Sequence, residues 1–214
     1  MVCVVCRHRY TEELADPIQS DPIRRVKRWL ADAHAAGVKE PNAMTLATAS
    51  SSGIPSARMV LLKSIDRRGF SFFTNYLSRK GRELKQNPRA ALVLYWPALD
   101  RQIRITGRVS RLSAAESEKY FRSRAAGSQF SAAVSPQSQV IESRAILEAR
   151  LAELKAQYPD SAPPRPTHWG GYLVRPEEIE FWTQGEHRLH DRLRYRRARS
   201  GAQRGKWTLQ RLAP

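Results

Sequence analysis

The segment 180–192 (EFWTQGEHRLHDR) gathers side chains that can move protons or hold anions. His187 and His190 lie close together, with the guanidinium of Arg188 between them. A histidine exchanges protons near neutral pH, and an arginine stabilises negative charge that develops during a reaction. The two histidines also suggest a metal, but no cysteine or carboxylate set completes a ligand group at a suitable spacing, so no metal site is expected. A polar surface hairpin would account for the arginines, but it leaves the grouping of Trp182 with two histidines unexplained.

A second segment, 74–80 (TNYLSRK), has the composition of a phosphate site. The pattern predicts a strand that ends near Thr74 and a helix capped by Ser78, with Arg79 and Lys80 in its first turn. Cations at a helix N-terminus oppose the helix dipole and mildly destabilise the helix. The free N–H groups of that turn, together with two cations, nevertheless suit a phosphate. The segment therefore favours phosphate binding over a plain surface helix.

A third segment, 58–63 (RMVLLK), is a predicted strand with a cation at each end of an apolar run. Such a strand can lay a flat ring along its backbone while the cations hold anionic groups. Alternation divides its side chains between two faces, with Arg58, Val60 and Leu62 on one and Met59, Leu61 and Lys63 on the other. Taken alone the pattern is weak, because lysine and arginine are common at the solvated ends of strands.

The whole chain has 214 residues, with 37 Lys and Arg against 20 Asp and Glu, and a formal net charge of +17. Its hydrophobic fraction of 41% is sufficient for a folded core, which excludes disorder as a description of the whole chain. No apolar run approaches the roughly 18 residues that span a bilayer, and no signal peptide opens the chain, so we expect a cytoplasmic protein without membrane contact. The positive charge favours anionic partners, either nucleic acid or small phosphorylated molecules. No helix-turn-helix, zinc finger or RNP-like strand accompanies the arginines, so nucleic acid is not the expected partner.

The N-terminal segment 1–20 precedes the first predicted element and contains both cysteines of the chain, Cys3 and Cys6. They form one C-x-x-C pair with no second pair downstream, so we expect neither a disulfide framework nor a zinc or redox site there. The segment is interpreted as a frayed, disordered terminus without a function of its own, and residues 21–214 as one folded domain.

The remaining pattern predicts an α+β domain that is mainly β. Helices are expected over Pro22–Ala36, Ser78–Asn87, Ser113–Arg124 and Ser138–Tyr158. Strands are expected over Met44–Ala49, Ala57–Ile65, Phe70–Thr74, Ala90–Trp96, Arg101–Leu112, Gly171–Arg175, Glu180–Trp182, Arg192–Arg197 and Lys206–Leu212. Short strands with helices set between them indicate a single β-barrel-like domain.

From about Asp21 to Pro214 the chain resembles the pyridoxamine 5'-phosphate oxidase family, through the blocks RMVLLK, FFTNYLSRKGRELKQNP, RQIRITG, KYFRSR, SPQS, HWGGY, EFWTQGEHRLHDR and the terminal RLAP. The resemblance implies a split β-barrel with flanking helices, which forms a homodimer with FMN at the subunit interface. It also implies the oxidation of pyridoxine or pyridoxamine 5'-phosphate to pyridoxal 5'-phosphate, with O₂ reduced to hydrogen peroxide.

The resemblance also implies site residues, motif by motif. Those expected to bind FMN are Arg58, Met59, Val60, Leu61, Leu62, Lys63, Phe73, Thr74, Arg79, Lys80, Gln102, Gln137, Ser138, Trp182 and Arg192. Those expected to come from the second subunit are Gln137, Ser138, Trp182 and Arg192. Those expected to bind the substrate are Lys63, Tyr120, Arg124, Ser128, Arg188, Leu189 and His190, with Arg7 and Tyr10 from an N-terminal lid. Arg188 would assist proton removal or stabilise charge beside C4′ of the substrate, with His190 as its partner on the ring, so these two are the catalytic candidates.

The chain departs from the family pattern at a few positions. Phe73 stands where a tyrosine is usual, Ala125 and Ala126 where proline and arginine are usual, and Ala133 where tryptophan is common. The alternative from a different class is a flavin-binding split-barrel protein without oxidase activity. The cations and hydroxyls matching the substrate phosphate site favour the oxidase, because a flavin carrier has no need of them.

Overall fold

The computed structural model of this protein describes residues 21–198, 200–201 and 205–214. The predictions made for segment 1–20, which include Arg7, Tyr10 and the cysteine pair, lie outside these residues. Within the described ranges no helix is long and apolar enough to cross a membrane. The same part of the chain has no group of three or more histidine, cysteine or acidic side chains placed to bind a metal ion. The cytoplasmic location stays a prediction.

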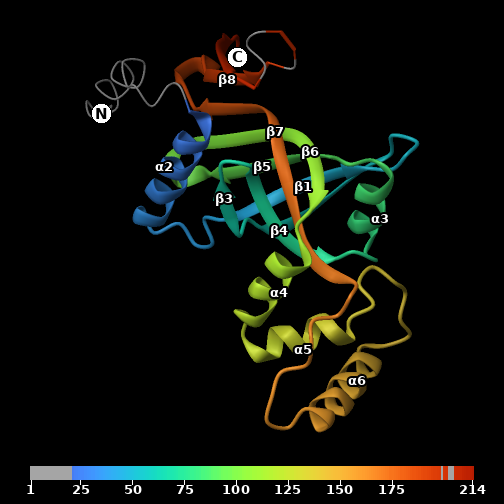
Figure 1. Ribbon diagram of the computed structural model, residues 1–214. Coiled ribbons are helices and arrows are strands. Elements are labelled where there is room, and N and C mark those ends of the chain that lie inside the picture. The colour runs from blue at the N-terminus through green and yellow to red at the C-terminus, as the bar shows by residue number, and fades with distance from the viewer. Residues whose placement is uncertain (1–20, 199, 202–204) are drawn as a thin grey trace.

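A curled antiparallel sheet of nine strands forms the body of the protein (Figure 1). Its strands are β1 (Ala43–Ala49), β2 (Pro55–Leu61), β3 (Ser64–Asp66), β4 (Gly69–Asn75), β5 (Arg89–Trp96), β6 (Arg101–Arg111), β7 (Trp169–Thr183), β8 (Asp191–Arg197) and β9 (Trp207–Leu212). The main path runs β2-β1-β5-β6-β7-β4-β3, and β8 pairs with β7 and β9. Because β2 leads directly into β3, the two edges of the curled sheet meet near residues 62–63.

The helices flank this sheet. They are α2 (Pro22–Ala35), α3 (Arg79–Gln86), α4 (Ala114–Arg122), α5 (Ala126–Val134) and α6 (Arg144–Gln157), with short 3₁₀ turns at Pro97–Leu99 and Glu186–Arg188. In Figure 1, α2 and α3 lie on opposite sides of the sheet, and α4, α5 and α6 form a group below it. Asp21, Ser78 and Ser113 cap α2, α3 and α4 through their side chains, which confirms the predicted helix starts.

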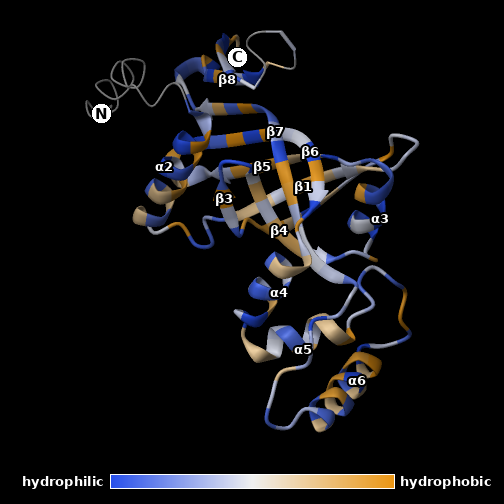
Figure 2. Cartoon of the chain, in the orientation of Figure 1, coloured by the Kyte–Doolittle hydropathy of each residue, from blue (hydrophilic) through white to orange (hydrophobic). Residues whose placement is uncertain are grey.

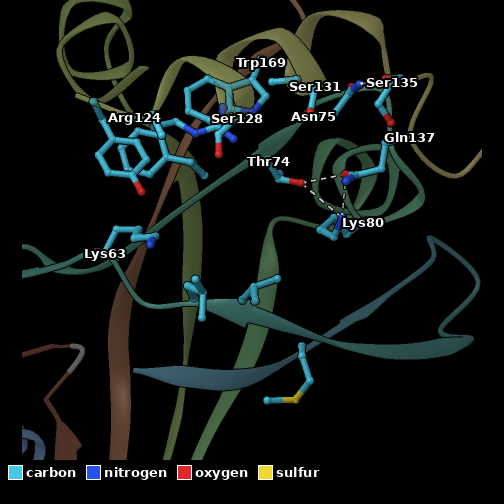
Figure 3. Close-up of a pocket in the computed structure, with 17 residues that line it drawn as sticks. Lys63, Thr74, Asn75, Lys80, Arg124, Ser128, Ser131, Ser135, Gln137 and Trp169 are labelled. Atoms are coloured by element: carbon cyan, nitrogen blue, oxygen red, sulfur yellow. Dashed lines mark hydrogen bonds between the residues drawn. The ribbon is translucent and has the colours of Figure 1, made fainter. Parts of the chain in front are cut away.

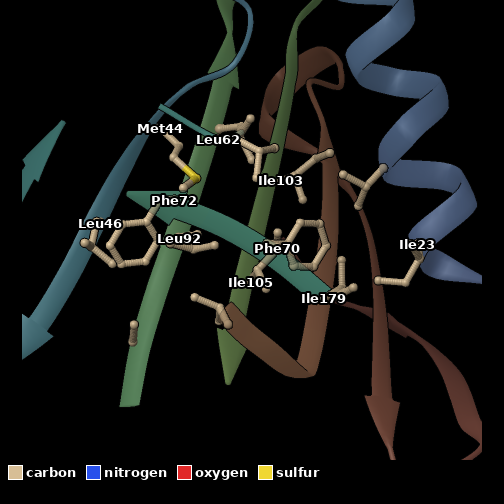
Figure 4. Close-up of a cluster of buried hydrophobic side chains, with 14 of the residues drawn as sticks. Ile23, Met44, Leu46, Leu62, Phe70, Phe72, Leu92, Ile103, Ile105 and Ile179 are labelled. Atoms are coloured by element: carbon tan, nitrogen blue, oxygen red, sulfur yellow. The ribbon is translucent and has the colours of Figure 1, made fainter. Parts of the chain in front are cut away.

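The core fills the inside of the curl. Ile103, Ile105, Gly107 and Val109 are buried along β6 while Arg104, Thr106 and Arg108 between them are exposed, which is the alternation of a strand with one face in the core. Figure 2 shows the same alternation of apolar and polar residues along the strands, and Figure 4 shows the buried cluster, drawn from α2 and the strands. Trp29 of α2 closes one end of the core edge-on against Phe181, with ring centroids 5.0 Å apart.

The predicted strand Ala57–Ile65 is two strands, because the chain changes partners at Leu62 and Lys63. β2 pairs with β1, whereas β3 pairs with β4. At the crossing, the N–H of Leu62 donates to the carbonyl of Asn42 and the N–H of Lys63 to the carbonyl of Ser71, both at 2.9 Å. The buried side chain of Leu62 anchors the crossing in the core.

β7, conversely, is one strand where the sequence predicted two, Gly171–Arg175 and Glu180–Trp182. Pro176 lies between these segments and cannot donate a hydrogen bond to the sheet. The neighbouring strand accommodates it through a shift of register between Thr106 and Gly107. β7 therefore runs the full length of the barrel.

Two helix predictions were wrong: α5 was not predicted, and α6 begins at Arg144 rather than Ser138. The N-cap position of α5 is Ala125, whose side chain cannot cap, and the helix contains serines and a glycine of low helix propensity. The buried side chain of Phe130 and the packing of α5 against α6 stabilise it instead. Local sequence patterns do not reveal such contacts.

We expect Gly107→Ala to destabilise the fold by about 1–3 kcal/mol, the usual cost of overpacking a rigid position. A Cβ there would lie 2.1 Å from the carbonyl oxygen of Arg175 and 3.0 Å from the Cα of Pro176. Both are backbone atoms of the neighbouring strand, which cannot move away as the end of a flexible side chain could. Gly127→Ala is the matched control, since nothing lies within 4 Å of its added Cβ. Urea denaturation checks the prediction, and equal midpoints for the two variants would contradict it.

Candidate functional site

A pocket of about 660 Å³ opens between β2, β4, α4 and α5 (Figure 3). The predicted site residues that line it are Met59, Val60, Leu61, Lys63, Phe73, Thr74, Lys80, Tyr120, Arg124, Ser128 and Gln137. Its other lining residues are Asn75, Ala125, Ser131, Ala132, Ser135 and Trp169. The structure thus gathers the residues of the RMVLLK, TNYLSRK and KYFRSR motifs around one cavity.

Lys80 lies at one end of the pocket, in the first turn of α3. Its ammonium donates to Oε1 of Gln137 at 3.0 Å, to Oγ1 of Thr74 at 3.2 Å and to Oγ of Ser78 at 3.4 Å. Burial lowers the pKa of Lys80 to about 8, and the charge of nearby Arg58 adds to this effect. Because all three hydrogen-bond partners are neutral, an anionic ligand would stabilise the charged lysine.

Arg58 lies behind this end of the pocket rather than in its lining. Nη1 of Arg58 donates to Thr48 at 2.5 Å, and Nη2 donates to Ser56 at 2.5 Å and lies 3.4 Å from Oε2 of Glu83. Arg79 is exposed, and its Nε donates to Oε1 of Glu83 at 2.9 Å. Burial acts to raise the pKa of Glu83, but the surrounding hydroxyl and guanidinium donors outweigh it and hold the pKa at about 2.

Arg124 lies at the other end of the pocket, near Lys63 (Figure 3). Its guanidinium stacks 4.7 Å from the centre of the Trp169 ring, and its Nη1 is buried with no hydrogen-bond partner in the part of the chain that the structure describes. Burial lowers the pKa of Arg124 from its usual value. The Nζ of Lys63 lies 5.9 Å from the ring of Tyr120. A buried guanidinium nitrogen without a partner, beside a second cation, suits an anion.

Stacked aromatic rings form the pocket wall at this end. The Phe73 ring lies 3.9 Å from that of Tyr120 and 5.5 Å from that of Trp169, nearly parallel to both. Phenylalanine in place of the family's tyrosine keeps this stack, because stacking does not require the hydroxyl. Of the other departures, Ala125 lines the pocket, and Ala126 and Ala133 do not.

A second group of predicted site residues lies at the far end of β7. Gln102 of β6, Trp182 of β7 and Arg192 of β8 are register partners across three neighbouring strands. The ring of Trp182 lies 4.7 Å from that of His190. The N–H of Gly185 donates to Nδ1 of His190 at 3.2 Å, so the proton of the neutral imidazole is on Nε2.

Arg188 and Leu189 project from this end on a strained turn. His187 and Arg188 have positive φ angles of 52° and 65°, a conformation that costs a non-glycine residue about 1–3 kcal/mol. The side chain of Arg188 is exposed and makes no hydrogen bond or ion pair within the described ranges, and Leu189 is 73% exposed. Exposed side chains on a strained backbone are typical of a contact with another molecule.

Arg192 is held from two directions. Its Nε donates to Oε1 of Glu180 and its Nη1 to the carbonyl of Ala213, both at 2.9 Å. The bond to Glu180 raises the pKa of Arg192 above its usual value. Arg211 pairs with Asp191 beside it, so the terminal RLAP segment packs directly behind the HDR motif.

The two groups lie at opposite ends of β7 within one chain (Figure 1). Trp169 in the pocket opens the strand, and Trp182 lies near its end. At about 3.3 Å per residue, the strand between them is about 40 Å long. A single chain therefore does not bring Arg188 and His190 to the pocket that holds the other predicted substrate residues.

Gln137 lines the pocket of its own chain, whereas the prediction has Gln137 and Ser138 completing the site from the second subunit. Gln137 accepts hydrogen bonds from Thr74 and Lys80 of its own chain. Asn75 anchors the segment that precedes Gln137, since Nδ2 of Asn75 donates to the carbonyl of Ser135 at 3.2 Å. Ser138, with φ of 71°, lies outside the pocket lining, as do Leu62 in the core and the exposed Arg79.

The remaining lining residues were not predicted as site residues. Trp169 and Asn75 belong to the HWGGY and TNYLSRK motifs, so the motifs themselves carried a signal that could have identified them. Ser131 and Ala132 lie on α5, and no pattern in the sequence indicated that helix.

Comparison with known proteins agrees with this geometry. Residues 30–158 match the pyridoxamine 5'-phosphate oxidase family, and residues 169–214 match the region described as the pyridoxine 5'-phosphate oxidase C-terminal dimerisation region. The pyridoxine/pyridoxamine 5'-phosphate oxidase of Salinibacter ruber is 56% identical over 200 residues, covering 93% of this chain and 92% of that protein. The enzyme of the same name from Trichormus variabilis is 51% identical over 210 residues, covering 97% of this chain and 96% of that protein.

Solved structures show the same fold. PhzG from Burkholderia lata, in complex with tetrahydrophenazine-1-carboxylic acid, has a TM-score of 0.86 and 42% identity, covering 94% of this chain and 96% of that chain. A pyridoxamine 5'-phosphate oxidase-related, FMN binding protein from Nostoc punctiforme has a TM-score of 0.67 at 19% identity, covering 86% of this chain and 96% of that chain, and shows the fold alone. On the matched regions and the identity to these relatives, the chain belongs to the pyridoxamine 5'-phosphate oxidase family.

Proposed function

We propose that this protein is an FMN-dependent oxidase that converts pyridoxine or pyridoxamine 5'-phosphate to pyridoxal 5'-phosphate, with O₂ reduced to hydrogen peroxide. The observation that carries the proposal is a pocket with two separate cationic ends, Lys80 at one and Arg124 with Lys63 at the other. A phosphorylated cofactor and a phosphorylated substrate suit this arrangement, because each end offers cations to a dianion. The names of relatives that match nearly the whole chain support the same reaction.

FMN fits the end of the pocket that carries Lys80. Lys80, Thr74 and the N-terminal turn of α3 would hold its phosphate, and the segment 59–61 of β2 would lie along its ring. Lys80 is a buried ammonium with neutral hydrogen-bond partners, so the phosphate would supply a counter-charge. When bound, FMN supplies a two-electron oxidation that O₂ completes.

The substrate phosphate is assigned to the other end of the pocket. Arg124 would direct its unpartnered Nη1 at the phosphate, and Lys63, Tyr120 and Ser128 would add a second cation and two hydroxyls. The aromatic stack that contains Phe73 holds Tyr120 in place. These contacts would hold the substrate by its phosphate and orient its ring for the residues that carry out the reaction.

A homodimer would complete the site, because the residues assigned to the substrate ring lie at the far end of β7 in each chain. In a two-fold dimer the far end of each chain can reach the pocket of its partner, which makes two equivalent sites. The match of residues 169–214 to a dimerisation region supports this arrangement. Arg188 would then stabilise negative charge or assist proton removal at C4′, His190 would contact the ring, and the exposed Leu189 would help exclude water.

We expect the affinity for FMN to fall as the pH rises above about 8. Lys80 holds a phosphate only when protonated, and burial together with Arg58 lowers its pKa to about 8 in the free protein. Bound phosphate raises that pKa, so binding takes up a proton above pH 8 and Kd increases up to about tenfold per pH unit. Fluorescence titrations from about pH 7 to pH 10 check this, with Lys80→Arg as a control that should remove the dependence. A Kd that stays constant across that range would contradict it.

The direct test of the proposed function is an assay of the FMN-loaded protein under air. Pyridoxine 5'-phosphate should yield pyridoxal 5'-phosphate and hydrogen peroxide in equal amounts. A yellow, FMN-bound protein that forms no aldehyde from either substrate would support the alternative, a flavin-binding protein without oxidase activity. A protein that takes up no FMN would contradict both.

A further inference from the structure

We propose that Glu83 is a positioning residue for the FMN phosphate, whose carboxylate fixes Arg58 and Arg79 beside Lys80 before the cofactor binds. The proposal rests on the proposed FMN site and adds to it a residue that lies outside the pocket lining. Glu83 lies one turn after Lys80 on α3, and its side chain is buried. A buried acid beside cations assigned to a phosphate is unexpected, because like charges repel.

Each carboxylate oxygen of Glu83 has its own donors. Oε2 accepts from Thr48 at 2.5 Å and from Ser56 at 2.6 Å, and it lies 3.4 Å from Nη2 of Arg58. Oε1 accepts from Nε of Arg79 at 2.9 Å. These donors belong to β1, β2 and α3, so one carboxylate joins three elements at the phosphate end of the pocket.

The same hydroxyls fix Arg58. Its Nη1 donates to Thr48 at 2.5 Å and to the carbonyl of Leu46 at 3.3 Å, and its Nη2 donates to Ser56 at 2.5 Å. Both terminal nitrogens are therefore held, and the side chain has little freedom to lose when a ligand binds. Arg58 also helps to lower the pKa of Lys80, which places its charge within range of the phosphate site.

Glu83 offsets the repulsion among the cations when no phosphate is bound. Without its carboxylate, Arg58 would lose an ion pair, and Arg79, whose side chain is 57% exposed, would lose its acidic partner. The pKa of Glu83, about 2, keeps the carboxylate ionised at neutral pH. Because Glu83 lies outside the pocket lining, its charge acts on the arginines and on Lys80, whose pKa it acts to raise, rather than directly on the ligand.

The test compares FMN with riboflavin, which has the same ring system and no phosphate. Fluorescence titration of the FMN-free protein should show that the wild type binds FMN more tightly than riboflavin. Glu83→Ala should reduce this affinity ratio about tenfold, roughly the effect of one charged hydrogen bond, with riboflavin binding unchanged. Glu83→Gln should reduce it only about threefold, because the amide oxygen still accepts from Thr48 and Ser56. A merely structural role would weaken the binding of both flavins together.

Glu148→Gln is the matched control, since Glu148 pairs with Arg144 on the exposed surface of α6. Should Glu83→Ala fail to fold, Glu83→Gln carries the test. An unchanged or increased ratio in Glu83→Gln, or an equal loss for both flavins, would overturn the role of Glu83. A wild-type protein that binds FMN no better than riboflavin would instead overturn the proposed phosphate site itself.

Discussion

Replacing Arg188 with alanine is expected to lower kcat at least about 100-fold while FMN stays bound, since groups that stabilise charge or move a proton contribute this much. Arg188 lies at the opposite end of β7 from Lys80, so its loss leaves the phosphate site of the same chain intact. Its side chain is exposed and has no side-chain partner in the described ranges, so the substitution breaks no contact of the fold. The loss should therefore appear in the reaction rather than in stability.

Steady-state kinetics with pyridoxine 5'-phosphate and an FMN titration of the same preparation check this prediction. Arg67→Ala is the control, because Arg67 is an exposed arginine outside both groups of site residues. An Arg188→Ala enzyme with kcat within a few-fold of the wild type would contradict the catalytic role.

The second large effect is expected for Lys80→Met, which should weaken FMN binding about 100-fold. The buried ammonium is the cation closest to Thr74 and Gln137 at this end of the pocket. Arg79→Ala should weaken binding only a few-fold, because the Arg79 side chain is 57% exposed and solvent screens its charge. From the motif alone the two cations looked equivalent, and only their burial separates them.

Fluorescence titration of both variants at neutral pH measures the difference. As a control, both variants should keep the kcat of the wild type at saturating FMN, since neither Lys80 nor Arg79 is assigned to the reacting atoms. Equal losses for the two variants, or a larger loss for Arg79→Ala, would show that burial does not decide the contribution of each cation.

Much of the fold could be predicted from the sequence, because its signals are local. Alternation along β6 and the side-chain caps at Asp21, Ser78 and Ser113 each depend on a few neighbouring residues. The errors arise where long-range contacts decide. β7 continues through Pro176 because β6 adapts its register, and α5 forms because it packs against α6.

The candidate site shows the same difference between local sequence signals, which could be predicted, and long-range contacts, which could not. The motifs identified most of the pocket-lining residues, but no pattern indicated that Arg188 and His190 lie at the other end of a long strand. Two buried acids that hold the arginines lie within the quoted motifs but were not predicted as site residues, because nothing in the local pattern shows which arginines they contact. Glu83 pairs with Arg58 and Arg79, and Glu180 pairs with Arg192 and Arg104. In a chain of net charge +17, these two buried carboxylates fix arginines in both halves of the site.

We expect each complete site to combine the pocket of one subunit with the Arg188 end of the other. A mixed dimer of one Lys80→Met subunit and one Arg188→Ala subunit tests this arrangement. The two variants are unfolded together and refolded with FMN, at an FMN concentration that does not saturate the Lys80→Met site. In such a dimer one site carries both substitutions and the other carries neither.

Each variant alone should be nearly inactive under these conditions. Because random pairing makes half of the dimers mixed, and each mixed dimer has one intact site, the refolded mixture should recover about a quarter of wild-type activity. If each site lay within one chain, every site would keep one substitution, and the mixture would be no more active than the average of the two variants.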